Sequence, residues 1–157
     1  MMANQTLNGE PLVILLVEDN PDHAELLMRV LQDHRVANRI YHVADGEAAE
    51  NYLLRRGDYA DQAKSPRPHV ILLDVRLPKV DGLELASEIM TSPQLRKIPV
   101  VMLTTSKAEK EMLQAYEQHA DGYLVKPVDF VKLTQQLGSL GFYWLGWNQC
   151  PWSEQEP

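Results

Sequence analysis

The stretch Leu12-Val13-Ile14-Leu15-Leu16-Val17-Glu18-Asp19 is apolar for six residues and then ends in two acids. An uninterrupted apolar run of this length is typical of a strand that is buried on both faces of a parallel sheet. The pattern returns at residues 70–74, where apolar residues again lead into an acid, Asp74. These two runs predict central strands of an α/β protein, with carboxylates at their carboxyl ends.

The segments between such runs carry apolar residues at helical spacing, so strands and helices alternate along the chain. We expect strands at 12–17, 39–43, 70–74, 99–103 and 122–125, and helices at 22–34, 48–53, 82–90, 108–118 and 128–137. Five strands joined through helices imply right-handed crossovers and a parallel sheet covered on both faces. The polar segment 57–68 is expected to form an exposed loop, longer than most such connections.

Length and composition narrow the class of protein. A chain of 157 residues, 45% hydrophobic and 24% charged, fits one folded domain. The net charge of −7, without a basic cluster, argues against direct binding to nucleic acid. Neither a basic, apolar leader nor an apolar stretch of membrane length is present, so a cytoplasmic protein with no membrane contact is expected.

Polar residues follow four of the predicted strands. Glu18 and Asp19 follow the first, Asp74 ends the third, Thr104 follows the fourth and Lys126 follows the fifth. The ligand site of an open parallel sheet lies at this edge, and three carboxylates there would repel one another without a cation. Oxygen ligands without His or Cys favour Mg²⁺, or Mn²⁺ as its substitute, and leave coordination positions for phosphate oxygens. Lys126 could then pair with a phosphoryl group and Thr104 could donate a hydrogen bond to it.

The motifs at these strand ends resemble those of two-component response-regulator receivers. They are Leu-Val-Glu18-Asp19-Asn, Leu-Leu-Asp74-Val-Arg-Leu-Pro78-Lys-Val-Asp81-Gly82, Leu103-Thr104-Thr105 and Tyr123-Leu-Val-Lys126-Pro127. The resemblance implies a flavodoxin-like (βα)5 fold, a doubly wound parallel sheet of five strands in the order 2-1-3-4-5. It places the receiver domain at 12–140, after a flexible N-terminus at 1–11 and before an aromatic tail at 141–157, with no separate output domain.

The same resemblance assigns the acceptor and its metal ligands. Asp74 would carry the phosphoryl group as 4-aspartylphosphate. Asp19, Asp74 and the backbone carbonyl of Arg76 would bind Mg²⁺ directly, and Glu18 would bind it through water. Arg76 is bulkier than many residues at its position, and together with Ser106 it would tune the access of water and the lifetime of the phosphorylated state.

The resemblance also assigns the switch. Thr104 would be the hydroxyl that moves toward the phosphoryl group, Tyr123 the aromatic residue that changes rotamer with it, and Lys126 the bridging cation. The Lys126-Pro127 bond is a candidate for the cis form, which is accessible to X–Pro bonds at little cost in energy. The change would be relayed to the face formed by helix 108–118, strand 122–125 and helix 128–137.

Five shorter motifs are similar to those of stand-alone response regulators that serve phytochrome histidine kinases. They are Arg55–Ala60, Gln94–Pro99, Thr104-Thr105-Ser106, Ala115–Ala120 and Phe142–Leu145. The resemblance implies a sensor histidine kinase of the phytochrome type as the partner. The aromatic tail beside the switch face also predicts a homodimer through that face.

Two other functions are compatible with the architecture. An aspartate-nucleophile phosphohydrolase would use a second Asp two residues after the nucleophile, where this chain has Arg76. A flavin- or nucleotide-binding module would need a glycine-rich phosphate loop after the first strand, which instead leads into Glu18-Asp19-Asn20-Pro21. We therefore expect a phosphorylation switch that catalyses only its own aspartyl phosphorylation and dephosphorylation, and is otherwise not an enzyme.

Overall fold

The computed structural model describes residues 12–33, 38–116 and 120–140, in which strands and helices alternate. The elements are β1 (Leu12–Val17), α1 (Pro21–Asp33), β2 (Asn38–Val43), α2 (Gly46–Leu54), η2 (Gly57–Ala60), η3 (Gln62–Lys64), β3 (Val70–Asp74), α3 (Gly82–Thr91), β4 (Val100–Thr104), α4 (Lys107–Tyr116), β5 (Gly122–Val125) and α5 (Phe130–Ser139). The predicted flexible segment 1–11 and aromatic tail 141–157 lie outside the described residues. No helix within the described ranges is long and apolar enough to cross a membrane.

The strands form one parallel sheet in the order β2-β1-β3-β4-β5, as predicted. β1 lies between β2 and β3: Leu15 pairs with Tyr41 of β2 on one side and with Ile71 of β3 on the other. β3 and β4 are buried along their whole length, which explains why their sequences are continuous apolar runs rather than alternating ones.

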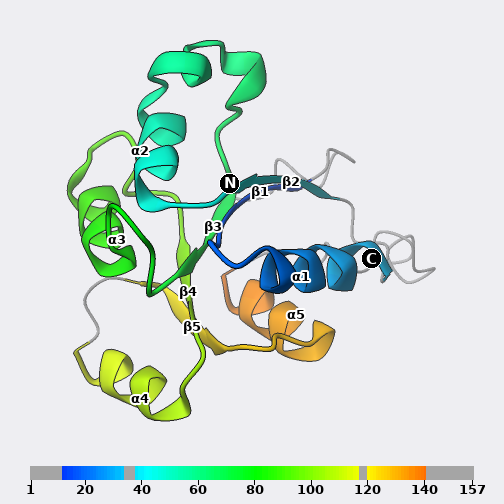
Figure 1. Cartoon of the computed structure of the whole chain (residues 1–157). Coiled ribbons are helices and arrows are strands. Elements are labelled where there is room, and N and C mark those ends of the chain that lie inside the picture. The colour runs from blue at the N-terminus through cyan, green and yellow to red at the C-terminus, as the bar shows by residue number, and fades with distance from the viewer. Residues whose placement is uncertain (1–11, 34–37, 117–119, 141–157) are drawn as a thin grey trace.

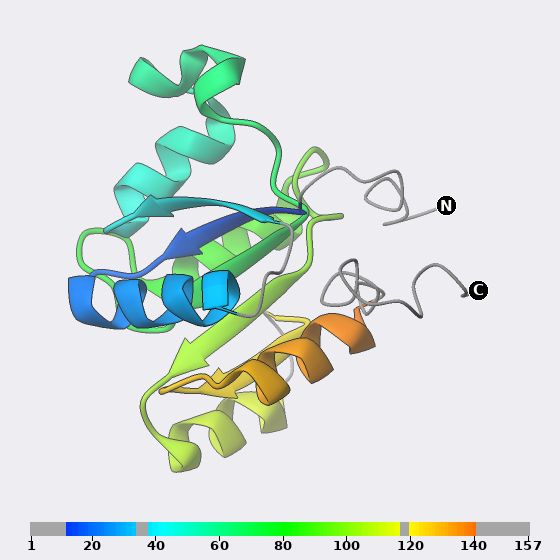
Figure 2. The same ribbon diagram turned by 90° about the vertical axis from the view of Figure 1, so that its right-hand side faces the viewer.

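Helices cover both faces of the sheet (Figures 1 and 2). On one face α2, α3 and α4 contribute Tyr52, Leu85 and Leu113 to a core layer. On the other face α1 and α5 contribute apolar residues such as Leu27 and Leu133 to a second layer. Successive side chains of each strand alternate between these two layers, so the sheet is held from both sides and its carboxyl edge is left for polar residues.

The segment 57–68 is more ordered than the exposed loop that the sequence predicts. It contains two 3₁₀ turns, η2 and η3, beyond the end of α2 (Figure 1). Side chains of neighbouring segments hold its backbone: the Tyr52 hydroxyl donates to the carbonyl of Pro66 at 2.7 Å, and Arg55 Nη2 donates to the carbonyl of Ser65 at 3.1 Å. Ser65 is fully buried. Composition alone did not reveal these bonds, because they depend on where α2 places its side chains.

Candidate functional site

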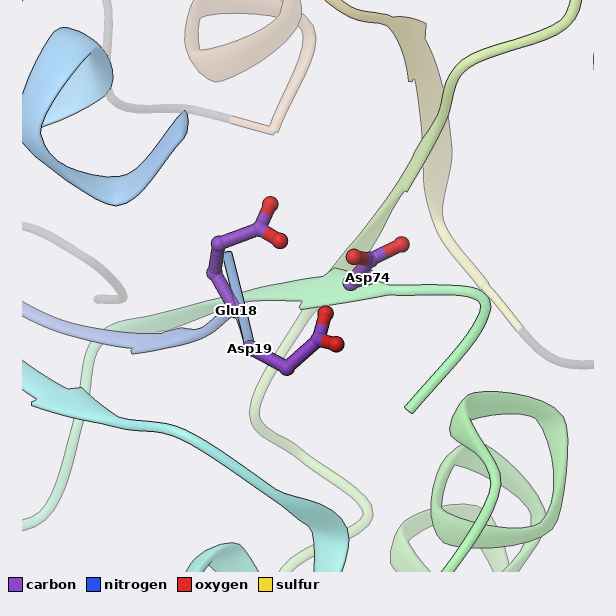
Figure 3. A group of neighbouring side chains, drawn as sticks. All are labelled: Glu18, Asp19 and Asp74. Atoms are coloured by element: carbon purple, nitrogen blue, oxygen red, sulfur yellow. The ribbon is translucent and has the colours of Figure 1, made fainter. Parts of the chain in front are cut away.

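Three acids meet at the carboxyl edge of the sheet. Glu18 and Asp19 directly follow β1, and Asp74 is the last residue of the neighbouring strand β3. One carboxylate oxygen from each lies within 4.8 Å of the other two, and Figure 3 shows the three side chains directed toward a common space. Glu18 and Asp74 are buried whereas Asp19 is exposed. The cluster is therefore a concentrated negative charge that solvent reaches from one side.

The backbone around β3 fixes the position of Asp74. The amide of Arg76 donates to Asp74 Oδ1 at 3.2 Å, and the amide of Gly82 donates to the carbonyl of Val75 at 3.1 Å. A Cβ atom at Gly82 would lie only 2.1 Å from the carbonyl oxygen of Asp74, so the start of α3 approaches β3 at a distance that only glycine permits. Asp81 caps this helix by accepting a hydrogen bond from the amide of Leu83 at 3.2 Å.

Lys126, the residue after β5, places its ammonium group between two of the acids. Its Nζ lies 2.7 Å from Glu18 Oε1 and 3.2 Å from Asp74 Oδ2. The backbone amide of Lys126 donates to the carbonyl of Thr104 at 2.7 Å, which ties this loop to β4, and the peptide bond to Pro127 is cis. Lys126 Nζ also lies 3.1 Å from His23 Nδ1, a contact across 103 positions that the sequence did not reveal.

The pKa of Asp74 is raised even though Lys126 lies beside it. Burial, a hydrogen bond with Glu18 and the negative charge of Glu18 raise the pKa of Asp74 to about 6, while Lys126 and the amide of Arg76 act in the opposite direction. The single ammonium group of Lys126 thus does not balance the negative charge of the cluster. The donor set is carboxylate oxygen only, and Asp19 is accessible, so the residues fit a hard divalent cation such as Mg²⁺.

The cluster belongs to a cavity of about 230 Å³ at the edge of the sheet. The residues that line it are Glu18, Asp19, Asn20, His23, Asp74, Arg76, Thr104, Thr105, Glu109 and Lys126. Six of the residues that the sequence suggested are therefore brought together here. Tyr123 is instead buried in the core layer beneath α2, α3 and α4. Pro127 lines an adjoining cavity beside α1, and this cavity shares Glu18, His23, Thr105 and Lys126 with the site.

Glu109 is the acid that the sequence reasoning missed. It lies in the first turn of α4, where one carboxylate oxygen accepts a hydrogen bond from the Thr104 hydroxyl and the other lies 2.6 Å from Arg76 Nη2. The spacing of Ser106 and Glu109 matches the capping-box pattern, which predicts a helix start with a Glu folded back over it. That pattern could have placed Glu109 over the start of α4, although it gives no sign of the bond to Thr104.

Comparison with known proteins agrees with this geometry. The family model described as "Response regulator receiver domain" matches residues 14–138. The "Probable methanogenesis regulatory protein FilR2" of Methanothrix harundinacea is 45% identical over 90% of this chain and 89% of its own length. The "Response regulator Rcp1" of Synechocystis is 40% identical, over 88% of this chain and 92% of its own.

Solved structures give the same result. The bacteriophytochrome response regulator AtBRR superposes with a TM-score of 0.80 at 41% identity, over 88% of this chain and 99% of that one. The bacteriophytochrome response regulator RtBRR has a TM-score of 0.79 at 40% identity, over 93% of this chain and 87% of that one. The Mn²⁺-bound form of Rcp1 has a TM-score of 0.68 at 40% identity, over 86% and 95%. The likeness therefore extends across the whole folded part of the chain.

Proposed function

Because the chain belongs to the response-regulator receiver family, we propose that it accepts a phosphoryl group from a sensor histidine kinase onto Asp74. The observation that carries this proposal is the position of Asp74, buried at the end of β3 with carboxylate oxygens of Glu18 and Asp19 within 4.8 Å and with Lys126 Nζ at 3.2 Å. A nucleophilic carboxylate beside a cation site and a fixed ammonium is the arrangement that phosphoryl transfer requires. The receiver domain spans residues 12–140.

Mg²⁺ is the cofactor of this proposal, and Mn²⁺ substitutes for it. Asp19, Asp74 and the backbone carbonyl of Arg76 would hold the ion, and Glu18 would contact it through water. When bound, the ion supplies positive charge to the oxygens of the transferring phosphoryl group. The oxygen-only donor set and the Mn²⁺ bound by the related Rcp1 support this assignment.

The chain's own residues orient the reaction. A carboxylate oxygen of Asp74 forms a bond to phosphorus while the bond between phosphorus and the kinase histidine breaks. Lys126 already lies beside this carboxylate and needs only a small movement to pair with a phosphoryl oxygen. Thr104 has to turn, because its hydroxyl now donates to Glu109. Tyr123, buried on β5 under α4, would change rotamer as Thr104 moves.

A phytochrome-type histidine kinase is the proposed donor. The names of the related AtBRR and RtBRR, both bacteriophytochrome response regulators, support this partner, as do the shared sequence motifs. We further propose that the signal leaves through the face formed by α4, β5 and α5, by docking or by homodimerisation that includes the tail at 141–157. Light scattering that finds only monomer at high concentration, with and without phosphorylation, would contradict the dimer.

Intact-mass measurement tests the acceptor. The protein is incubated with acetyl phosphate and Mg²⁺, beside Asp74→Asn and a sample treated with a chelator. Asp81→Asn is the matched control, since Asn replaces Asp well at a helix N-cap. One phosphoryl adduct is expected in the wild type and in Asp81→Asn alone. An adduct on Asp74→Asn would contradict the proposal. No adduct on any sample would mean either an acceptor that only a kinase phosphorylates or a site that no longer switches.

Steady turnover separates this function from a phosphohydrolase. Residue 76 is an arginine whose guanidinium is paired with Glu109, and no carboxylate stands at that position to act as the acid and base of a hydrolase. Release of phosphate from a small phosphomonoester is therefore expected to stay at the background rate. Sustained, Asp74-dependent release would favour the enzyme instead.

A further inference from the structure

The start of α4 is capped in an unusual way. Ser106 stands before the first residue of this helix, and its Oγ accepts a hydrogen bond from the amide of Glu109 at 3.1 Å, which is one half of a capping box. In the usual second half, the Glu carboxylate accepts the amide of the Ser. Here the Ser106 amide donates to Thr104 Oγ1 at 3.2 Å, and the Thr104 hydroxyl donates in turn to the carboxylate of Glu109. The Thr104 hydroxyl is thus inserted between the two members of the box.

Glu109 is held from a second direction by Arg76. The Arg76 guanidinium reaches from the loop after β3 and lies 2.6 Å from Glu109 Oε2, while the backbone amide of the same residue donates to Asp74 Oδ1. The Glu109 side chain is only 11% exposed, although the Arg76 side chain is 78% exposed. Both carboxylate oxygens of Glu109 are therefore occupied, one by Thr104 and one by a residue that also contacts the acceptor.

We propose that Glu109 is a positioning residue that holds the Thr104 hydroxyl in its unphosphorylated position. This inference rests on the proposed function of Asp74 as the phosphoryl acceptor. The Thr104 oxygen has one hydrogen to donate, so it cannot serve Glu109 and a phosphoryl oxygen at the same time. Ser106 O, 3.5 Å from Thr104 Oγ1, is a much poorer acceptor than the charged carboxylate.

The geometry defines what replaces the bond when Thr104 turns. The Ser106 amide loses its acceptor, and the freed oxygen of Glu109 can accept that amide directly, which completes the ordinary capping box. The first turn of α4 thus has two capped arrangements, one through Thr104 and one without it. Glu109 determines the balance between them and hence how strongly the phosphoryl group must attract Thr104 to switch the domain.

A double-mutant cycle separates this role from a simple effect of charge. The probe is beryllofluoride with Mg²⁺, bound to the wild type, Glu109→Ala, Thr104→Val and the double variant. Because a hydrogen bond to a charged group opposes the switch, Glu109→Ala should bind the probe about tenfold more tightly than the wild type. In the Thr104→Val background the same change should alter affinity by less than about twofold.

Two further variants sharpen the test. Glu109→Gln keeps an oxygen that can accept a hydrogen bond from the Thr104 hydroxyl, so its affinity for beryllofluoride should rise less than that of Glu109→Ala. Glu111→Ala removes the same charge from an exposed position of α4 and should leave affinity within about twofold of the wild type. The inference would be overturned if Glu109→Ala left beryllofluoride affinity unchanged, or if it raised that affinity equally in the wild type and in Thr104→Val.

A measurement without the probe keeps the two proposals distinct. In the free protein, the methyl resonance of Thr104 in Glu109→Ala should move toward its position in the beryllofluoride complex, while Glu111→Ala should leave it in place. An unmoved resonance would overturn the role of Glu109. Failure of the wild type to bind the probe better than Asp74→Asn would instead contradict the acceptor role of Asp74. If binding of beryllofluoride depends on Asp74 but the effects of Glu109→Ala and Thr104→Val simply add, only the inference about Glu109 is overturned.

Discussion

Replacement of Asp74 by asparagine should stabilise the metal-free protein. Asp74 is 6% exposed, and burial together with Glu18 raises its pKa from the ordinary 3.8 to about 6. A difference of about two units, at 1.36 kcal/mol each, means that the ionised carboxylate costs the folded state about 3 kcal/mol at pH 7.5. Asparagine has nearly the same shape and no charge, so Asp74→Asn should raise the free energy of unfolding by up to that amount.

The sign of the pH dependence is fixed by the direction of the shift. An acid with a raised pKa in the folded state contributes stability that is complete below 3.8 and is lost as the pH rises through about 6. The gain from Asp74→Asn should therefore fall from about 3 kcal/mol at pH 7.5 to roughly half of that at pH 5. At pH 7.5, Mg²⁺ at a hundred times its dissociation constant should stabilise the wild type by about 2.7 kcal/mol and so nearly cancel this gain, and at a thousand times, by about 4.1 kcal/mol, it should reverse the order.

Urea unfolding followed by circular dichroism is the assay, at both pH values, with a chelator and then with Mg²⁺. Asp58→Asn, at an exposed position of η2, is the charge-matched control and should stay within about 0.5 kcal/mol of the wild type. A gain for Asp74→Asn that is absent, or equal at pH 5 and pH 7.5, would refute the electrostatic account of the site.

Three other substitutions test the surrounding structure. A hydrogen bond with Glu50, together with burial and nearby acids, raises the pKa of Glu88 from 4.5 to about 7, so stability should fall between about pH 4.5 and pH 7. Glu88→Gln should flatten that slope in urea unfolding, and an unchanged slope would contradict this origin. Gly82→Ala forces a Cβ against the Asp74 carbonyl and should lower the free energy of unfolding by about 3 kcal/mol. Gly57→Ala has open space around it and only a positive φ to oppose it, so it should cost about 1 kcal/mol. Equal costs in urea unfolding would argue against the close approach at Gly82. Tyr52→Phe leaves the Pro66 carbonyl without its donor and should cost about 1 to 2 kcal/mol, measured against Tyr41→Phe, for which less than about 0.5 kcal/mol is expected.

The central strands were predictable because β1, β3 and β4 are buried almost throughout, on both faces of the sheet. The run 70–73 has no polar position, so its composition alone identifies it as a strand, and it ends in Asp74 at the polar edge. The five-stranded order also agrees with the order that the family resemblance implied. Helix ends were less exact: α1 begins at Pro21 itself, one residue before the predicted helix, in keeping with the fit of proline to a first helical turn.

The contacts that the sequence left hidden all depend on tertiary placement. Lys126 meets His23 only because β5 ends and α1 begins at the same edge of the sheet, and no local pattern relates the two residues. Arg76 was considered for its size, yet its partner is Glu109, which the position of α4 brings to it. Ser106 and Glu109 do carry a local signal, but the capping box predicts a helix start rather than a bond to Thr104.

Locating the phosphoryl group on the chain tests whether Asp74 is the acceptor. The protein is phosphorylated with Mg²⁺ present and reduced with borohydride, which converts an aspartyl phosphate into homoserine, and its peptides are then analysed by mass spectrometry. Homoserine is expected at position 74 alone, and none when Mg²⁺ is chelated. Homoserine at position 19, or a phosphoryl group on any other residue in place of Asp74, would contradict the acceptor role of Asp74.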